Sequence, residues 1–185
     1  IFHRYFGFPP RNPSDGDPIN KDRQDFSICQ QFFALAARPE RPPEEFAAKA
    51  RPFCLQAGLP DSGILDEAIA TVQTKVQTLA EVPDKIRFFF DLSMDPEALA
   101  KVQPEAVELL SKLADRLERE PVWDGHELIG VLKAFAKENG VKMGAVMFPA
   151  RVALTGLSGG PDLSSVFSLL GKEESLKRIR ALSLN

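Results

Sequence analysis

The sequence contains little that could build a metal site, a disulfide framework or a membrane span. Its 185 residues include two cysteines and two histidines. Cys29 and Cys54 form no CxxC pair and have no histidine at metal-ligand spacing, which predicts reduced, buried thiols rather than zinc ligands. No apolar run approaches the ~20 residues that cross a bilayer, and the first residues lack the basic start and apolar core of a signal peptide. We therefore expect a cytoplasmic protein that binds no metal and no membrane.

The common catalytic signatures are also missing. There is no P-loop and no GxGxxG run. His126-Glu127 lacks the second histidine of an HExxH helix, because Gly130 stands at that position. Asp124 and Glu127 have instead the spacing of a helix capping box, which needs no substrate. The sequence predicts no catalytic residue in this chain.

Charge is unevenly distributed along the chain. The net charge of −3 argues against a broad basic surface that grips duplex nucleic acid through its phosphates. From Lys142 onward, however, six basic residues stand against three acidic ones. Lys177, Arg178 and Arg180 fit the cationic last turns of a C-terminal helix, which the helix dipole favours. A mildly acidic protein with a positive end is compatible with reading single-stranded RNA loops, since these are recognised mainly by stacking and base-edge hydrogen bonds.

Apolar residues recur at helical spacing along most of the chain, and no segment shows sustained strand alternation. The pattern predicts an all-α fold, a helical bundle or cage of about eight to ten short helices in two subdomains. Pro52 should kink or restart the second helix, and Lys75 should face outward from the third. The expected helices cover residues 23–37, 42–57 and 62–78 and start again after Asp95, at Pro104 and after Asp124 and Asp162.

A polar, proline-containing break near residues 119–122 suggests a border between the two subdomains. We expect residues 1–38 to form a connector and first helix, residues 39–120 a first helical subdomain and residues 121–185 a second one. No internal repeat is present.

Residues 156–163, called the glycine turn below, contain three glycines and, next to the last position, a candidate helix cap, Asp162. Bare backbone N–H groups before a helix N-terminus can receive a phosphate oxygen or a base edge. Arg151 lies just upstream and could add a planar set of donors. The plainer interpretation is that Gly156 ends one helix, Asp162 caps the next and Arg151 is solvated.

Several short segments decide between these interpretations. They are Ala50–Leu59 (ARPFCLQAGL), Lys75–Leu79 (KVQTL), Val82–Phe90 (VPDKIRFFF), Val141–Gly156 (VKMGAVMFPARVALTG), Leu169–Glu173 (LLGKE) and Leu176–Ile179 (LKRI). In this order they resemble the C-terminal anticodon-binding region of bacterial-type glutamyl-tRNA synthetases, which are class I aminoacyl-tRNA synthetases. The resemblance runs from roughly residue 40 to the end and leaves the first three dozen residues unmatched.

The resemblance implies a tRNA anticodon-binding domain of a glutamate-tRNA ligase, with the anticodon loop of glutamate tRNA as its partner, acting as a monomer in protein biosynthesis. ATP and Mg²⁺ would serve the catalytic part of the parent enzyme, and no cofactor is expected in this chain. Neither a HIGH-type signature nor a KMSKS loop is present, since Gly144 follows Lys142-Met143.

The resemblance also assigns the anticodon contacts. These fall on Lys75, Arg151, Gly160, Pro161, Asp162 and Leu163. Lys75 is the position that reads the third anticodon base, where relatives that separate glutamate tRNA from glutamine tRNA carry arginine. Lysine offers a point charge without a bidentate fork. Gly160 replaces a hydroxyl residue of some relatives, which leaves only backbone contacts there.

One alternative stays open at this point. A non-catalytic helical scaffold for protein–protein interaction could use the acidic first half of the chain and an exposed run of three phenylalanines, Phe88–Phe90.

Overall fold

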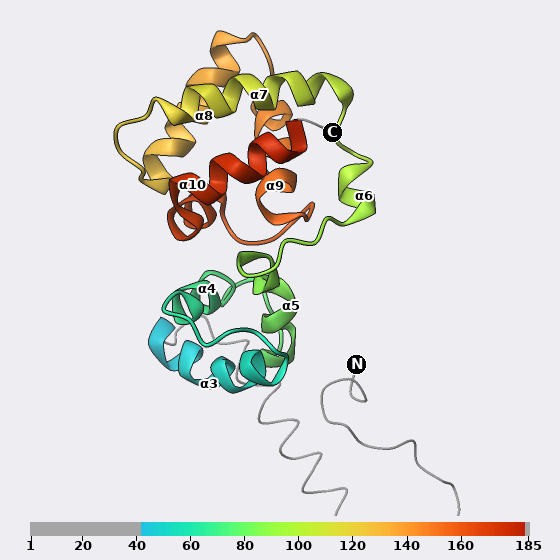
Figure 1. Ribbon diagram of the computed structural model, residues 1–185. Coiled ribbons are helices and arrows are strands. Elements are labelled where there is room, and N and C mark those ends of the chain that lie inside the picture. Colours follow the sequence, from blue (N-terminus) through green and yellow to red (C-terminus); the bar gives the residue numbers. More distant parts are fainter. Residues whose placement is uncertain (1–41, 184–185) are drawn as a thin grey trace, which may run out of the picture. The chain divides into compact units, whose positions relative to one another are not determined.

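The computed structural model describes residues 42–183, which fall into two compact units, 42–86 and 87–183. The described residues form α-helices and short 3-10 helices and contain no strand, which confirms the predicted all-α class. Figure 1 shows the helices along the chain. The predicted helix at 23–37 and the predicted connector at 1–38 lie outside the described residues. The predicted border near residue 121 falls between two helices of the second unit and stays a prediction.

The first unit is built around its longest helix. Helix α3 (Pro43–Gln56) packs against α4 (Leu65–Thr71), the 3-10 helix η1 (Leu79–Glu81) and α5 (Val82–Ile86). The residues that are wholly or almost wholly removed from solvent are apolar and come from all of these elements: Phe46, Ala50, Cys54, Leu65, Ala68, Ile69, Leu79, Val82 and Ile86.

Of the two outcomes expected at Pro52, a kink or a restart of the helix, the restart is wrong, and the kink stays a prediction. The helix runs unbroken from Pro43 to Gln56 with Pro52 inside it. A proline there removes the N–H that the Ala48 carbonyl would otherwise accept. Both Ala48 and Pro52 are exposed, so water can satisfy that carbonyl.

The expected helix at 62–78 is much shorter than predicted. It ends at Thr71, whose hydroxyl donates to the Ala68 carbonyl at 2.7 Å, and residues 72–75 form turns. β-Branched residues are frequent beyond this point and lower helix propensity. The apolar positions Val72 and Val76 are nevertheless buried, so the predicted core set is right although its secondary structure is not.

The second unit surrounds its last helix. Helix α10 (Leu163–Ser183) packs against α7 (Pro104–Glu118), α8 (Gly125–Glu138) and α9 (Met143–Thr155), and Figure 1 shows it in red among them. Two short elements precede them, η2 (Arg87–Phe89) and α6 (Pro96–Leu99).

The predicted helix starts and stops in this unit are confirmed. The Asp95 carboxylate accepts from the Glu97 N–H at 3.0 Å. That of Asp124 accepts from the His126 and Glu127 N–H groups at 2.9 and 3.0 Å. Asn139 is the C-cap of α8. These carboxylates satisfy N–H groups that a helix start otherwise leaves without partners.

Helix α10 changes direction at Gly171, whose backbone is not helical (φ 72°, ψ 176°). On either side of this break, hydrogen bonds join the helix to the segment that connects α7 with α8. The Trp123 indole N–H donates to the Phe167 carbonyl at 2.9 Å, and the Lys172 ammonium donates to the Glu120 carbonyl at 2.9 Å. Both parts of α10 are thereby bonded to the same connecting segment.

Gly156 ends α9 in a left-handed conformation (φ 72°) and lies against another chain segment. Its carbonyl accepts from the Asp95 N–H at 2.9 Å. A Cβ atom at this position would overlap the Ser93 carbonyl oxygen. Only glycine combines this φ with such a close approach.

We expect Gly156→Ala to lower the free energy of unfolding of the protein by about 1–3 kcal/mol, because it adds backbone strain and a steric overlap. The matched control is Gly130→Ala in α8, where an added Cβ meets nothing within 4 Å. That variant should be about 0.5–1 kcal/mol more stable than the wild type, since alanine favours helix. Urea unfolding followed by circular dichroism measures both. Equal stability of the two variants would contradict the described packing of Gly156.

Candidate nucleic-acid interface

The structure brings Arg151 and the glycine turn together. Arg151 lies in the last turns of α9, and its Nη1 donates to the Pro161 carbonyl at 2.7 Å. Donor and acceptor residues are ten positions apart in the sequence, with the glycine turn closing the loop between them. The guanidinium therefore lies at the start of α10, where the sequence places the candidate site.

The Arg151 guanidinium is only partly desolvated and keeps spare hydrogen-bonding capacity. Its side chain is half-buried, and this burial lowers its pKa while the charge of Asp162 acts in the opposite direction. Among residues 42–183 it forms no ion pair and one hydrogen bond, the bond to Pro161. A guanidinium carries five N–H donors. Most of these donors are thus available to a ligand.

The glycine turn has free space around its middle residues, whereas residues at both of its ends are buried. A Cβ atom at Gly159 or Gly160 would meet nothing within 4 Å, and Gly160 has a φ of 147°. Pro161 and Leu163 are buried. Asp162 is exposed, and its carbonyl accepts from the Val166 N–H at 3.1 Å as α10 begins.

Gly156 does not contribute to this opening. The sequence suggests that three glycines leave the turn uncovered, but Gly156 is buried against Ser93. The uncovered backbone is therefore limited to the residues around Gly159 and Gly160.

Lys75 belongs to the first unit. It lies in the turn after α4, and its side chain is exposed as predicted. The structure therefore brings Arg151 together with residues 160–163 and places Lys75 on a separate element.

No metal or membrane feature appears in the part of the chain that the structure describes. Cys54 is buried, and desolvation raises the pKa of its thiol to about 11, so it stays protonated and unreactive at neutral pH. Cys29 lies outside the described residues. Between residues 42 and 183, no group of three metal-ligating side chains gathers and no helix is long and apolar enough to cross a membrane.

The sequence model of the anticodon binding domain family matches residues 45–183. The chain belongs to this family. The match confirms the resemblance on which the site residues were assigned, and it covers both described units of this anticodon-binding domain.

Individual relatives agree with this membership. A glutamate–tRNA ligase of Akkermansia muciniphila is 86% identical over 144 residues, which cover 78% of this chain and 33% of the relative. A glutamate–tRNA ligase of Thermus thermophilus is 38% identical over 145 residues, 76% of this chain and 31% of the relative. The chain spans about a third of the length of these relatives.

A solved structure shares the fold. The crystal structure of a glutamate tRNA ligase from Elizabethkingia meningosepticum superposes with a TM-score of 0.70 at 22% identity, covering 84% of this chain and 31% of that one. At this identity the match supports the helical fold.

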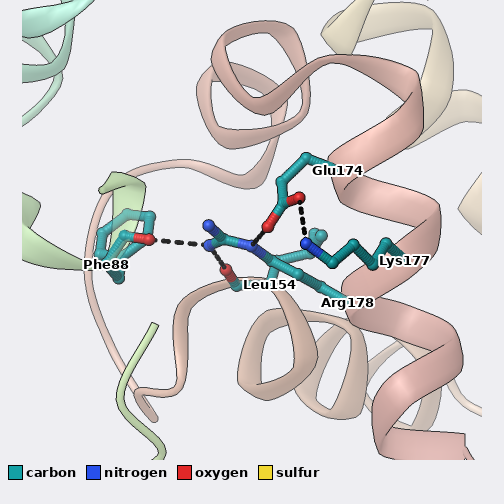
Figure 2. Close-up of polar contacts among 5 residues, drawn as sticks. All are labelled: Phe88, Leu154, Glu174, Lys177 and Arg178. Atoms are coloured by element: carbon teal, nitrogen blue, oxygen red, sulfur yellow. Dashed lines mark hydrogen bonds and ion pairs between the residues drawn. The ribbon is translucent and has the colours of Figure 1, made fainter. Parts of the chain in front are cut away.

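Arg178 has a different role from the one that the sequence suggests. It is 5% exposed rather than solvated at a helix end. Its Nη1 donates to the Phe88 and Leu154 carbonyls, both at 2.8 Å, and its Nε donates to the Glu174 carboxylate at 2.8 Å (Figure 2). This bond to Arg178 is also the main cause that lowers the pKa of the Glu174 carboxyl.

One weak pattern in the sequence could have indicated that Arg178 is buried. Residues 175, 178 and 182 are spaced so that they share a helix face, and all three are buried. A charged residue on an apolar face indicates an internal partner, but here the partners are backbone carbonyls, which the sequence cannot identify.

The phenylalanine run is not an exposed docking surface. Phe88 and Phe89 are 3% and 6% exposed, and their rings lie 4.2 Å apart between centroids. The expectation of an exposed Phe88–Phe90 patch is therefore wrong, because the Phe88 and Phe89 rings help to form the core of their unit and Phe90 is half-buried.

We expect Arg178→Met to lower the free energy of unfolding by about 2–4 kcal/mol, since two buried carbonyls lose their donor. Arg180→Met is the matched control on the same helix, because Arg180 pairs at the surface with Glu118 and Asp115. Exposed ion pairs contribute little, so this control should unfold close to the wild type. Urea titration measures both, and equal losses would show that Arg178 does not hold the core.

Proposed function

We propose that this chain is the anticodon-binding domain of a glutamate-tRNA ligase and that it reads the anticodon loop of glutamate tRNA. The family match and the two ligase relatives support the assignment. The single observation that carries it is the half-buried Arg151 guanidinium bonded to Pro161, with unused donors beside an open glycine backbone.

Recognition at this site works on bases that have left their stack. In RNA, sequence is read mainly from single-stranded loops, whose base edges are accessible to hydrogen bonds. Arg151 would supply planar donors to a base edge or phosphate. Further contacts would come from the backbone and the carboxylate in the turn, and buried apolar side chains would form the floor of the site. The residues concerned are Gly160, Pro161, Asp162 and Leu163. Because the second strand of a duplex would block these edges, the site selects a loop.

Lys75 would approach the third anticodon base from the first unit. Its exposed ammonium is a flexible point charge, and it lacks the fork that distinguishes two acceptors on a base. We therefore propose that readout at this base is less strict than in relatives with arginine.

The site performs equilibrium recognition, and glutamate activation with ATP and Mg²⁺ would belong to the catalytic region of the ligase. We place the protein in the cytoplasm as a monomer. The scaffold alternative is not favoured, since the phenylalanine run that it would use is largely buried.

Arg151→Ala tests the assignment. We expect about 10- to 100-fold weaker binding of glutamate tRNA, because charge-assisted hydrogen bonds are lost. The full 185-residue chain is titrated with glutamate tRNA and with a non-cognate tRNA at one stated salt concentration, since phosphate contacts depend on salt. The matched control is Arg119→Ala, which removes the same charge from an exposed position at the end of α7. Equal binding of both tRNAs, unchanged by Arg151→Ala, would refute the proposal.

Lys75→Arg tests the third-base contact separately. We expect the preference for glutamate tRNA over an otherwise identical tRNA with a changed third anticodon base to rise roughly threefold to tenfold, because a bidentate fork replaces a point charge. Lys85→Arg is the matched control, since Lys85 is also an exposed lysine of the first unit. Competition binding with the two RNAs measures the preference. An equal effect of both substitutions would show that Lys75 does not contact the third anticodon base.

A further inference from the structure

The hydroxyl of Thr155 connects Arg151 to the glycine turn. Thr155 is fully buried at the last position of α9. Its Oγ1 donates to the Arg151 carbonyl at 2.9 Å and accepts from the Leu157 N–H at 3.2 Å. A threonine that bonds back to the carbonyl four residues earlier is common in helices. Here the same oxygen also receives an N–H from beyond the helix end, so one atom joins the residue that carries the guanidinium to the start of the turn.

The neighbouring peptides are held from the interior. The last carbonyls of a helix have no partner within it. Arg178 donates to that of Leu154, as Figure 2 shows, and the Asp95 N–H donates to that of Gly156. The bond to Leu154 thus holds the peptide before Thr155. The Gly156 carbonyl and the Leu157 N–H belong to one peptide, which the Asp95 N–H holds at its carbonyl and the Thr155 hydroxyl holds at its N–H.

We propose that Thr155 is a positioning residue of the anticodon site, whose hydroxyl fixes the Leu157 peptide so that the Arg151 guanidinium and the Gly159–Gly160 backbone address the RNA together. This inference rests on the proposed function. Thr155 itself is fully buried and acts through the backbone that it holds.

The hydroxyl matters separately from the volume of the side chain. Valine has nearly the shape of threonine but cannot accept the Leu157 N–H, and a buried donor without a partner is costly. Serine keeps the hydroxyl and loses only a methyl group. A role in packing therefore predicts that Thr155→Val is the milder change, whereas a positioning role predicts that Thr155→Ser is.

The test uses the full 185-residue chain and two readouts. The first is amide hydrogen exchange and chemical shift at Leu157, Gly159 and Gly160, measured by NMR without RNA. The second is the ratio of affinities for the glutamate-tRNA anticodon stem-loop and for the same stem-loop with a changed anticodon. Ser183→Ala is the matched control, since its hydroxyl donates to the Arg180 carbonyl at 2.8 Å in the last turn of α10.

We expect Thr155→Val to speed exchange at Leu157 about tenfold or more, to shift the Gly159 and Gly160 amides and to reduce the affinity ratio by about tenfold. Thr155→Ser and Ser183→Ala should retain wild-type behaviour in both readouts. Unchanged amides and an unchanged ratio in Thr155→Val, or equal losses in the valine and serine variants, would overturn the inference. If the wild type itself fails to distinguish the two stem-loops while Thr155→Val still moves the amides, the proposed function is wrong and the placement of the turn by Thr155 stands.

Discussion

The second unit depends on one buried guanidinium. Arg178 joins the Phe88 segment, the end of α9 and its own helix α10 through backbone carbonyls and Glu174. Removing a cation from water is costly unless hydrogen bonds replace its hydration. The three bonds at 2.8 Å supply that replacement, and the bond to the Leu154 carbonyl joins α10 to the end of α9. The position of the candidate site follows, since Arg151 lies on α9 and Pro161 lies before α10.

The candidate site combines a buried, hydrogen-bonded part of the backbone with a part that is open to solvent. Gly156 and Thr155 are buried and fully engaged, whereas Gly159 and Gly160 have free space around them. The half-buried Arg151 side chain is intermediate in exposure, and one of its N–H groups donates to the Pro161 carbonyl. This division suits recognition of a splayed base, because pre-organised donors lose little conformational freedom on binding.

Part of this arrangement was predictable from the sequence because its causes are local. The Asp95 and Asp124 caps follow from neighbouring residues, and so does the pairing of Arg151 with the nearby glycine turn. The rest depends on contacts between distant segments. The close approach of Gly156 to Ser93 and the burial of Arg178 involve backbone carbonyls, which carry no residue-specific signal. Helix α4 ends early although its apolar spacing continues, and the turns that follow bury the same side chains that a longer helix would.

The bond between Arg151 and Pro161 joins residues only ten positions apart, and the entropy lost in closing such a short loop is small. Five of the six candidate contact residues therefore lie on one continuous segment, which the surrounding helices hold in place. Substitutions at the open positions of that segment can change the chemistry of the candidate site while the helical packing stays the same, so the properties of the site and the stability of the fold can change separately during evolution.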